Sequence, residues 1–128
     1  MRIEDHNSVC HATDPRKIDE ALGRRFDDGI NAFWLSHGDQ KFPAINLLVR
    51  GNLAYLHYFP NEDHAGFASV GELKNLIPGG ETKFLLENFV DWVQIVNEYI
   101  VLFADALKAA QEFAKSPTLP KSIRWDEL

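Results

Sequence analysis

Residues 42–60, "FPAINLLVRGNLAYLHYFP", constrain the fold more than any other stretch, because they specify a β-hairpin together with its register. Gly51-Asn52 is a two-residue loop of the kind that favours the primed turns of paired strands. We therefore expect residues 44–50 and 53–59 to pair antiparallel. The loop then sets the cross-strand pairs: Arg50 with Leu53, Leu48 with Tyr55, and Asn46 with His57.

The two faces of this predicted hairpin differ in character, since side chains alternate across a strand. The nearly pure apolar face is expected to pack on the core, and it consists of Ile45, Leu47, Val49, Ala54, Leu56 and Tyr58. The second face mixes aromatic, apolar and hydrogen-bonding groups: Asn46, Leu48, Arg50, Tyr55, His57 and Phe59. Two interpretations of the second face stay open. Either it is a docking surface, or a helix covers it and its polar groups are satisfied inside the protein.

Other elements follow from capping residues, turns and periodicity. Asp14 and Pro15 begin a helix over about residues 15–25, and an apolar stripe predicts an amphipathic helix over 103–115. Residues 31–37 and "GFASV" favour strands, and the tail "SIRWDEL" is expected to fold back on the domain.

Residues 82–101, "TKFLLENFVDWVQIVNEYIV", fit both a helical stripe and an alternating strand pattern. The β-branched and aromatic content favours strands, which we place at about 82–88 and 91–96. The whole chain, residues 1–128, is then one α+β domain. It has an antiparallel sheet of about five to six strands, on which an N-terminal helix and a C-terminal helix pack.

Composition limits the classes of protein to consider. The 45% of hydrophobic residues is enough for a core without disulfides or a structural metal. The single cysteine, Cys10, excludes an internal disulfide, and we interpret it as a small buried hydrophobe on a first strand. Stretches free of charged and amide side chains, such as "YIVLFA", are too short to span a bilayer, so a cytoplasmic protein is expected.

The formal net charge of −6 disfavours nucleic-acid binding, because neutralising phosphates requires a basic patch. An acidic protein favours encounter with basic partners instead.

No established catalytic, phosphate-binding or metal-binding motif occurs in the chain. His57 and His64, with Glu62 and Asp63 beside them, define the alternative hypothesis of a small-molecule or enzymatic site near residues 57–64. Cys10 and His11 do not form a catalytic pair, because adjacent strand residues point to opposite faces. The three tryptophans are expected in or near the core, and only an exposed one would indicate recognition.

The order of several stretches resembles a known family. These are "FPAINLLVRGNLAYLHYF", "PGGETKF", "ALKAAQEFAKS" and the terminal "IRWDEL", spread over about residues 30–128. The pattern is similar to the bacterial polymorphic-toxin immunity proteins that are often encoded beside cytidine deaminase toxins. The resemblance implies a compact α+β domain without catalysis or cofactor. It also implies a one-to-one complex in the cytoplasm with a cognate toxin domain, whose active site the immunity protein blocks.

The partner-binding residues are predicted from physical argument, because the resemblance transfers no contact positions. Aromatic and apolar groups ringed by polar ones dominate many interfaces, which selects the mixed hairpin face. The predicted contacts are Asn46, Leu48, Arg50, Tyr55, His57, Glu62 and Asp63, with Asp27 and Asp28 as further acidic candidates. An accessory protein that binds a partner other than a toxin is a third hypothesis.

Overall fold

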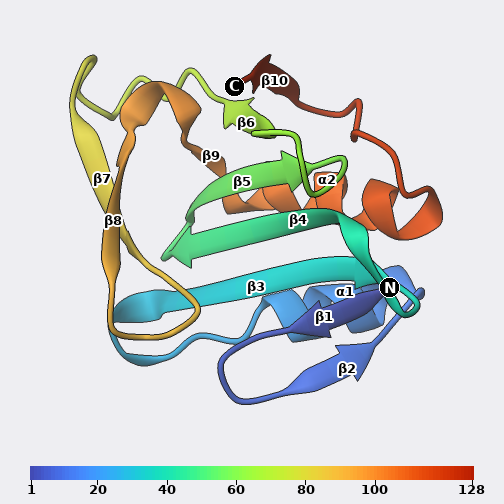
Figure 1. The fold of residues 1–128 in the computed structure, drawn as a ribbon. Helices are drawn as coiled ribbons and strands as arrows, with labels where there is room; N and C mark the ends of the chain where they lie inside the picture. The colour runs from blue at the N-terminus through green and yellow to red at the C-terminus, as the bar shows by residue number, and fades with distance from the viewer.

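The computed structural model describes residues 1–128 and is built around one antiparallel sheet with two helices on one face (Figure 1). The main sheet has the strand order β10-β6-β5-β4-β3-β1-β2, and β9 pairs with the start of β5. Two further strands, β7 and β8, form a separate hairpin. The α+β prediction is confirmed, with more strands than the five to six expected.

The element bounds are as follows. The strands are β1 Arg2–Glu4, β2 Val9–His11, β3 Ile30–His37, β4 Gln40–Arg50, β5 Leu53–Phe59, β6 Phe67–Val70, β7 Glu81–Leu85, β8 Trp92–Val96, β9 Val101–Leu102 and β10 Arg124–Glu127. The helices are α1 Pro15–Leu22 and α2 Phe103–Lys115, with short 3-10 turns η1 Asp27–Gly29 and η2 Asn97–Tyr99. Neither α-helix is long and apolar enough to cross a membrane.

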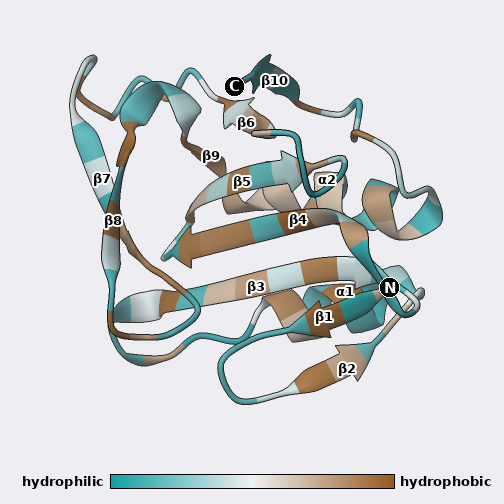
Figure 2. Cartoon of the chain, in the orientation of Figure 1, coloured by the Kyte–Doolittle hydropathy of each residue, from teal (hydrophilic) through white to brown (hydrophobic).

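The central hairpin has the predicted register. Arg50 lies opposite Leu53, and Asn46 lies opposite His57. The predicted apolar face packs against α1 and α2, where Ile45, Leu47 and Leu56 are fully buried in the larger core cluster. Figure 2 shows the strongly hydrophobic residues gathered in the central strands, whereas β10 and most loops are hydrophilic.

Both helices lie where capping and periodicity placed them. The Asp14 side chain accepts a hydrogen bond from the Arg16 backbone N–H at 2.8 Å, and Pro15 begins α1. Helix α1 ends at Leu22, three residues before the predicted end, whereas α2 has the predicted bounds. The two helices lie side by side, and Gln111 of α2 donates to the Asp19 carboxylate of α1 at 2.6 Å.

The segment with ambiguous periodicity forms two strands, as favoured from its composition, with β7 shorter than expected. The tail folds back as predicted: β10 pairs with β6, and Trp125 Nε1 donates to the Pro120 carbonyl at 2.7 Å. The interpretation of Cys10 was partly wrong. Its strand is the second, not the first, and its side chain is only half-buried at the edge of the core.

Candidate functional site

The face of the main sheet that points away from the helices is the candidate site, and we call it the open face (Figure 1). The β7–β8 hairpin and η2 cover the part of it over the β4–β5 turn. Phe84 and Ile100 are fully buried there in a second core cluster. The interpretation that a helix covers the second hairpin face was therefore only half right, because a β-hairpin does most of the covering. The rest of the open face meets solvent.

The cover changes the interpretation of two predicted contacts. Leu48 is 1% exposed and Tyr55 is 6% exposed, and both belong to the second core cluster. The free protein therefore does not present these side chains to a partner, and their prediction as exposed anchors was wrong. Burial raises the pKa of Tyr55 to about 12, with the nearby Tyr99 as a smaller cause, so its hydroxyl keeps its proton.

The uncovered part of the open face carries a continuous set of rings, which we call the aromatic row: Trp34, Phe42, His57 and Phe59. All four side chains are half-buried. His57 stacks on Phe59 with ring centroids 4.0 Å apart and an interplanar angle of 8°. Phe59 stacks on Trp34 at 5.7 Å, and Trp34 meets the Phe42 ring edge-on at 6.3 Å. The row brings together residues of β3, β4 and β5.

Hydrogen bonds fix the orientation of the His57 ring. Its Nε2 lies 2.8 Å from the Ala65 carbonyl oxygen, which can only accept, so Nε2–H is the donor. Nδ1 then accepts from the Tyr55 hydroxyl at 3.2 Å. Gly66 leaves room for this arrangement, because a Cβ there would overlap the His57 ring. The ring is thus held neutral between the covered and the uncovered parts of the open face.

The stability of the protein should fall as pH is lowered through the titration of His57. Burial lowers the pKa of His57 below its ordinary value of 6.5, and the Ala65 hydrogen bond acts in the opposite direction as a smaller cause. The unfolded chain therefore binds the proton more readily, and the stabilisation is present above pH 6.5 and lost below it. Urea midpoints at about pH 7.5 and 5.5 should differ more for the wild type than for His57→Gln. Equal differences would contradict this role of His57.

The other predicted contacts lie around the aromatic row or beyond the hairpin turn. Asn46, half-buried, donates to the Phe33 carbonyl at 3.0 Å and lies 3.4 Å from the Glu87 carboxylate. Glu62 and Asp63 are exposed in the loop that follows β5.

Arg50 is exposed but lies away from the row. Its guanidinium is 5.8 Å from the Trp92 ring centroid and donates to the Lys83 carbonyl. Asp27 and Asp28 are exposed in η1. Whether any of them contacts a partner stays a prediction.

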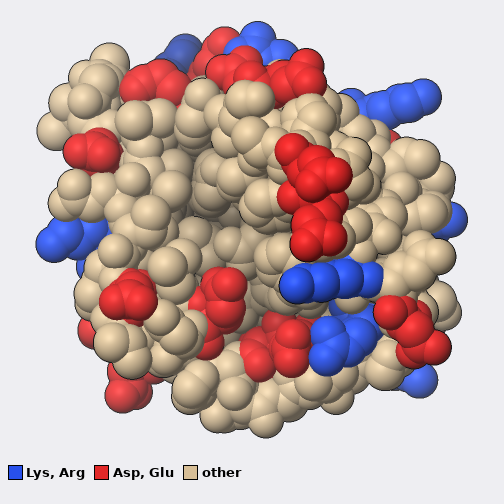
Figure 3. Space-filling model, viewed as in Figure 1, with Lys and Arg blue, Asp and Glu red and all other residues tan.

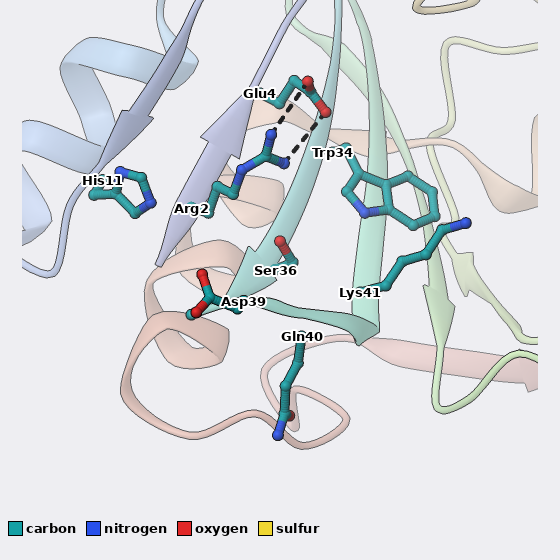
Figure 4. Close-up of a pocket in the computed structure, with 9 residues that line it drawn as sticks. Arg2, Glu4, His11, Trp34, Ser36, Asp39, Gln40 and Lys41 are labelled. Atoms are coloured by element: carbon teal, nitrogen blue, oxygen red, sulfur yellow. Dashed lines mark hydrogen bonds and ion pairs between the residues drawn. The ribbon is translucent and has the colours of Figure 1, made fainter.

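A cavity of about 470 Å³ lies at the β1 end of the open face, next to Trp34 (Figure 4). Its lining is almost entirely polar and includes Arg2, Glu4 and Lys41. Arg2 donates to both carboxylate oxygens of Glu4 at 3.3 Å, so these two charges neutralise each other.

The alternative site near residues 57–64 has its histidines engaged in structural hydrogen bonds. His64 Nδ1 accepts from the Gly66 backbone N–H at 2.7 Å, and Nε2 lies 2.7 Å from the Glu127 carboxylate. With His57 bonded to Tyr55 and Ala65, both rings hold the β5–β6 loop in place. The structure brings no group of three His, Cys, Asp or Glu side chains into an arrangement that could hold a metal ion.

Sequence reasoning missed Trp34 and Phe42 as members of the open face. The cross-strand pair of Trp34 with Asn46 places its ring on the mixed face of the hairpin. Extending the register across the "GDQ" turn would not have shown this, because the pairing of β3 with β4 shifts between Leu35 and His37. Trp92 is 49% exposed on the outer side of the β7–β8 hairpin, so the default placement of tryptophans in the core was wrong for this residue.

Comparison with known proteins gives one full-length similarity. No protein-family model matches the sequence. The chain is 24% identical to the double-stranded DNA deaminase immunity protein of Burkholderia cenocepacia strain H111, over all 128 residues and the full length of that protein. The similarity includes the first 30 residues, for which the sequence patterns gave little information.

Proposed function

We propose that this chain is an immunity protein that binds a cognate bacterial toxin domain, of the deaminase type, and neutralises it by covering its active site. The observation that carries the proposal is the similarity to a deaminase immunity protein along the entire chain. The order of sequence stretches predicted the same family from about residues 30–128 alone. The chain then acts by binding, without catalysis of its own, in a one-to-one complex in the cytoplasm.

The charge of the chain supports this partner. A domain that acts on double-stranded DNA holds a polyanion and needs a basic surface to do so. The net charge of −6 and the exposed carboxylates of the open face complement such a surface (Figure 3). Charge complementarity of this kind speeds encounter and disfavours wrong partners more than it adds affinity.

The contacts that we propose are accessible members of the predicted set. They are Asn46, His57, Glu62 and Asp63. Arg50 is also accessible, but we leave it out because it lies over the Trp92 ring and away from the aromatic row. The two buried residues of that set, Leu48 and Tyr55, lie under the β7–β8 hairpin, and Tyr55 orients His57 through its hydroxyl.

Co-expression with the toxin domain encoded next to this chain tests the proposal. Cells that produce the toxin alone should die or accumulate mutations, whereas cells that produce both proteins should survive and yield a co-purifying complex. A catalytically inactive toxin is the control for expression burden. Cell death despite folded protein of both kinds, with no complex recovered, would refute the proposed function.

A further inference from the structure

We propose that the open face imitates the nucleic-acid substrate of the toxin, with the aromatic row in the place of bases and surrounding carboxylates in the place of phosphates. This inference rests on the proposed function and adds the mode of inhibition. The occupant of the open face is then the DNA-binding groove of the deaminase domain.

The aromatic row has the geometry of a short stack. The His57 and Phe59 rings are nearly parallel, and the Phe59 and Trp34 rings are inclined by 27°. Grooves that hold exposed bases do so by stacking them on aromatic rings and on Arg guanidinium groups. The faces between His57, Phe59 and Trp34 are occupied by their mutual stacking, so a partner group can stack only on a ring face at an end of the row, where arginine adds cation–π attraction.

Acidic side chains lie around this row, and we call them the acidic rim: Asp39, Glu62, Asp63 and Glu87. All four are exposed, and none takes part in the four ion pairs of the structure. Glu87 borders the row through its contact with Asn46, and Glu62 and Asp63 follow Phe59 in the next loop. Figure 3 shows carboxylates around an uncharged, hollowed centre on this face.

Two cations, Arg2 and Lys41, lie at one end of the row, and they do not make the charge of the open face positive. Arg2 is paired with Glu4, and Lys41 Nζ lies 5.8 Å from the Phe42 ring centroid. The cavity beside Trp34 gives a side chain of the partner room to reach these groups.

The outer side of the β7–β8 hairpin is the rival surface. It exposes Val90, Trp92 and Val96. It also carries two cations: Arg50, which lies over the Trp92 ring, and Lys83, which pairs with Gln94 across the hairpin. Glu81, opposite Val96, is also exposed on this side, but the two cations make the surface a poorer match for a basic groove than the open face. Trp92 therefore supplies a matched exposed tryptophan for comparison with Trp34.

Competition with DNA tests the inference without any change to this protein. A catalytically inactive toxin domain is bound to a fluorescein-labelled DNA duplex, and the anisotropy is followed as this protein is added. We expect full displacement of the duplex, and an apparent Kd for the protein that rises in proportion to the DNA concentration. A ternary complex of duplex, toxin and this protein would overturn both the mimicry and the covering of the active site, while leaving the binding of the toxin intact. Failure to bind the toxin at all would overturn the whole proposed function as well.

Variants then locate the contact. Trp34→Ala should weaken toxin binding by at least about thirtyfold, as for a central interface residue, whereas Trp92→Ala should change it by less than about threefold. Trp34→Phe retains a ring and should lose less affinity than Trp34→Ala. Thermal melting in the absence of toxin verifies that each variant is folded. A larger loss for Trp92→Ala than for Trp34→Ala would assign the contact to the hairpin and overturn the inference.

Discussion

Replacing Gly71 by alanine is expected to lower the free energy of unfolding by about 3 kcal/mol, at the upper end of the range for overpacked sites. A Cβ at this position would overlap the carbonyl oxygen of Ile100 and lie 2.7 Å from its carbonyl carbon. Because the obstacle is backbone, no change of rotamer can relieve it. Ile100 is fully buried in the second core cluster, so the chain cannot simply move into solvent.

The close approach at Gly71 joins the main sheet to the segment that carries the covering hairpin. Its backbone N–H donates to the Glu98 carbonyl at 2.9 Å, and Ser69 nearby donates from its hydroxyl to the Tyr99 carbonyl at 2.8 Å. Separating the two backbones to admit a methyl group would lengthen these hydrogen bonds together. The destabilisation of Gly71→Ala should therefore include lost hydrogen bonding as well as steric repulsion.

Gly79→Ala is the matched control for this prediction. Gly79 has a φ of +76°, and a Cβ added there would have no neighbouring atom within 4 Å. Alanine at this position therefore meets only the strain of the left-handed backbone, about 1 kcal/mol. Urea unfolding followed by tryptophan fluorescence compares the two variants with the wild type. Equal destabilisation of both would mean that the Ile100 backbone yields to the added methyl group.

The elements that the sequence predicted well are those with strong local determinants. The Gly51-Asn52 turn set the register of β4 and β5, and the capping pair Asp14-Pro15 placed the start of α1. The α2 stripe was unambiguous because Ala and Phe repeat on one face over thirteen residues. Each of these depends on residues that are close in the sequence.

The cover over the open face depends instead on contacts between distant segments. Nothing in residues 44–59 indicates that Phe84 and Ile100 will lie against Leu48, because such packing is specified only in three dimensions. A hydrophobic residue on a mixed strand face is equally compatible with a partner and with an internal cover. For this reason the sequence separated the two faces of the hairpin but did not show that Leu48 and Tyr55 are covered within the protein itself.

Tyr55→Ala is expected to lower the free energy of unfolding by about 3–5 kcal/mol, as for other large aromatic residues in cores. The ring is 6% exposed and stacks on Tyr99 with centroids 6.4 Å apart, beneath the β7–β8 hairpin. Truncation leaves a cavity between hairpin and sheet and removes the hydroxyl that bonds His57. Urea unfolding gives the stability change, and wild-type stability of Tyr55→Ala would show that the second cluster contributes little.

Tyr55→Phe separates packing from hydrogen bonding, because it keeps the ring and removes only the hydroxyl. We expect it to destabilise the protein by about 0.5–1.5 kcal/mol, the range for one intramolecular hydrogen bond. Since the ring is covered, toxin binding by this variant should change only through the orientation of His57, which retains its bond to Ala65. A loss of affinity as large as that of Trp34→Ala would contradict this and place Tyr55 in the interface, after displacement of the hairpin that covers it.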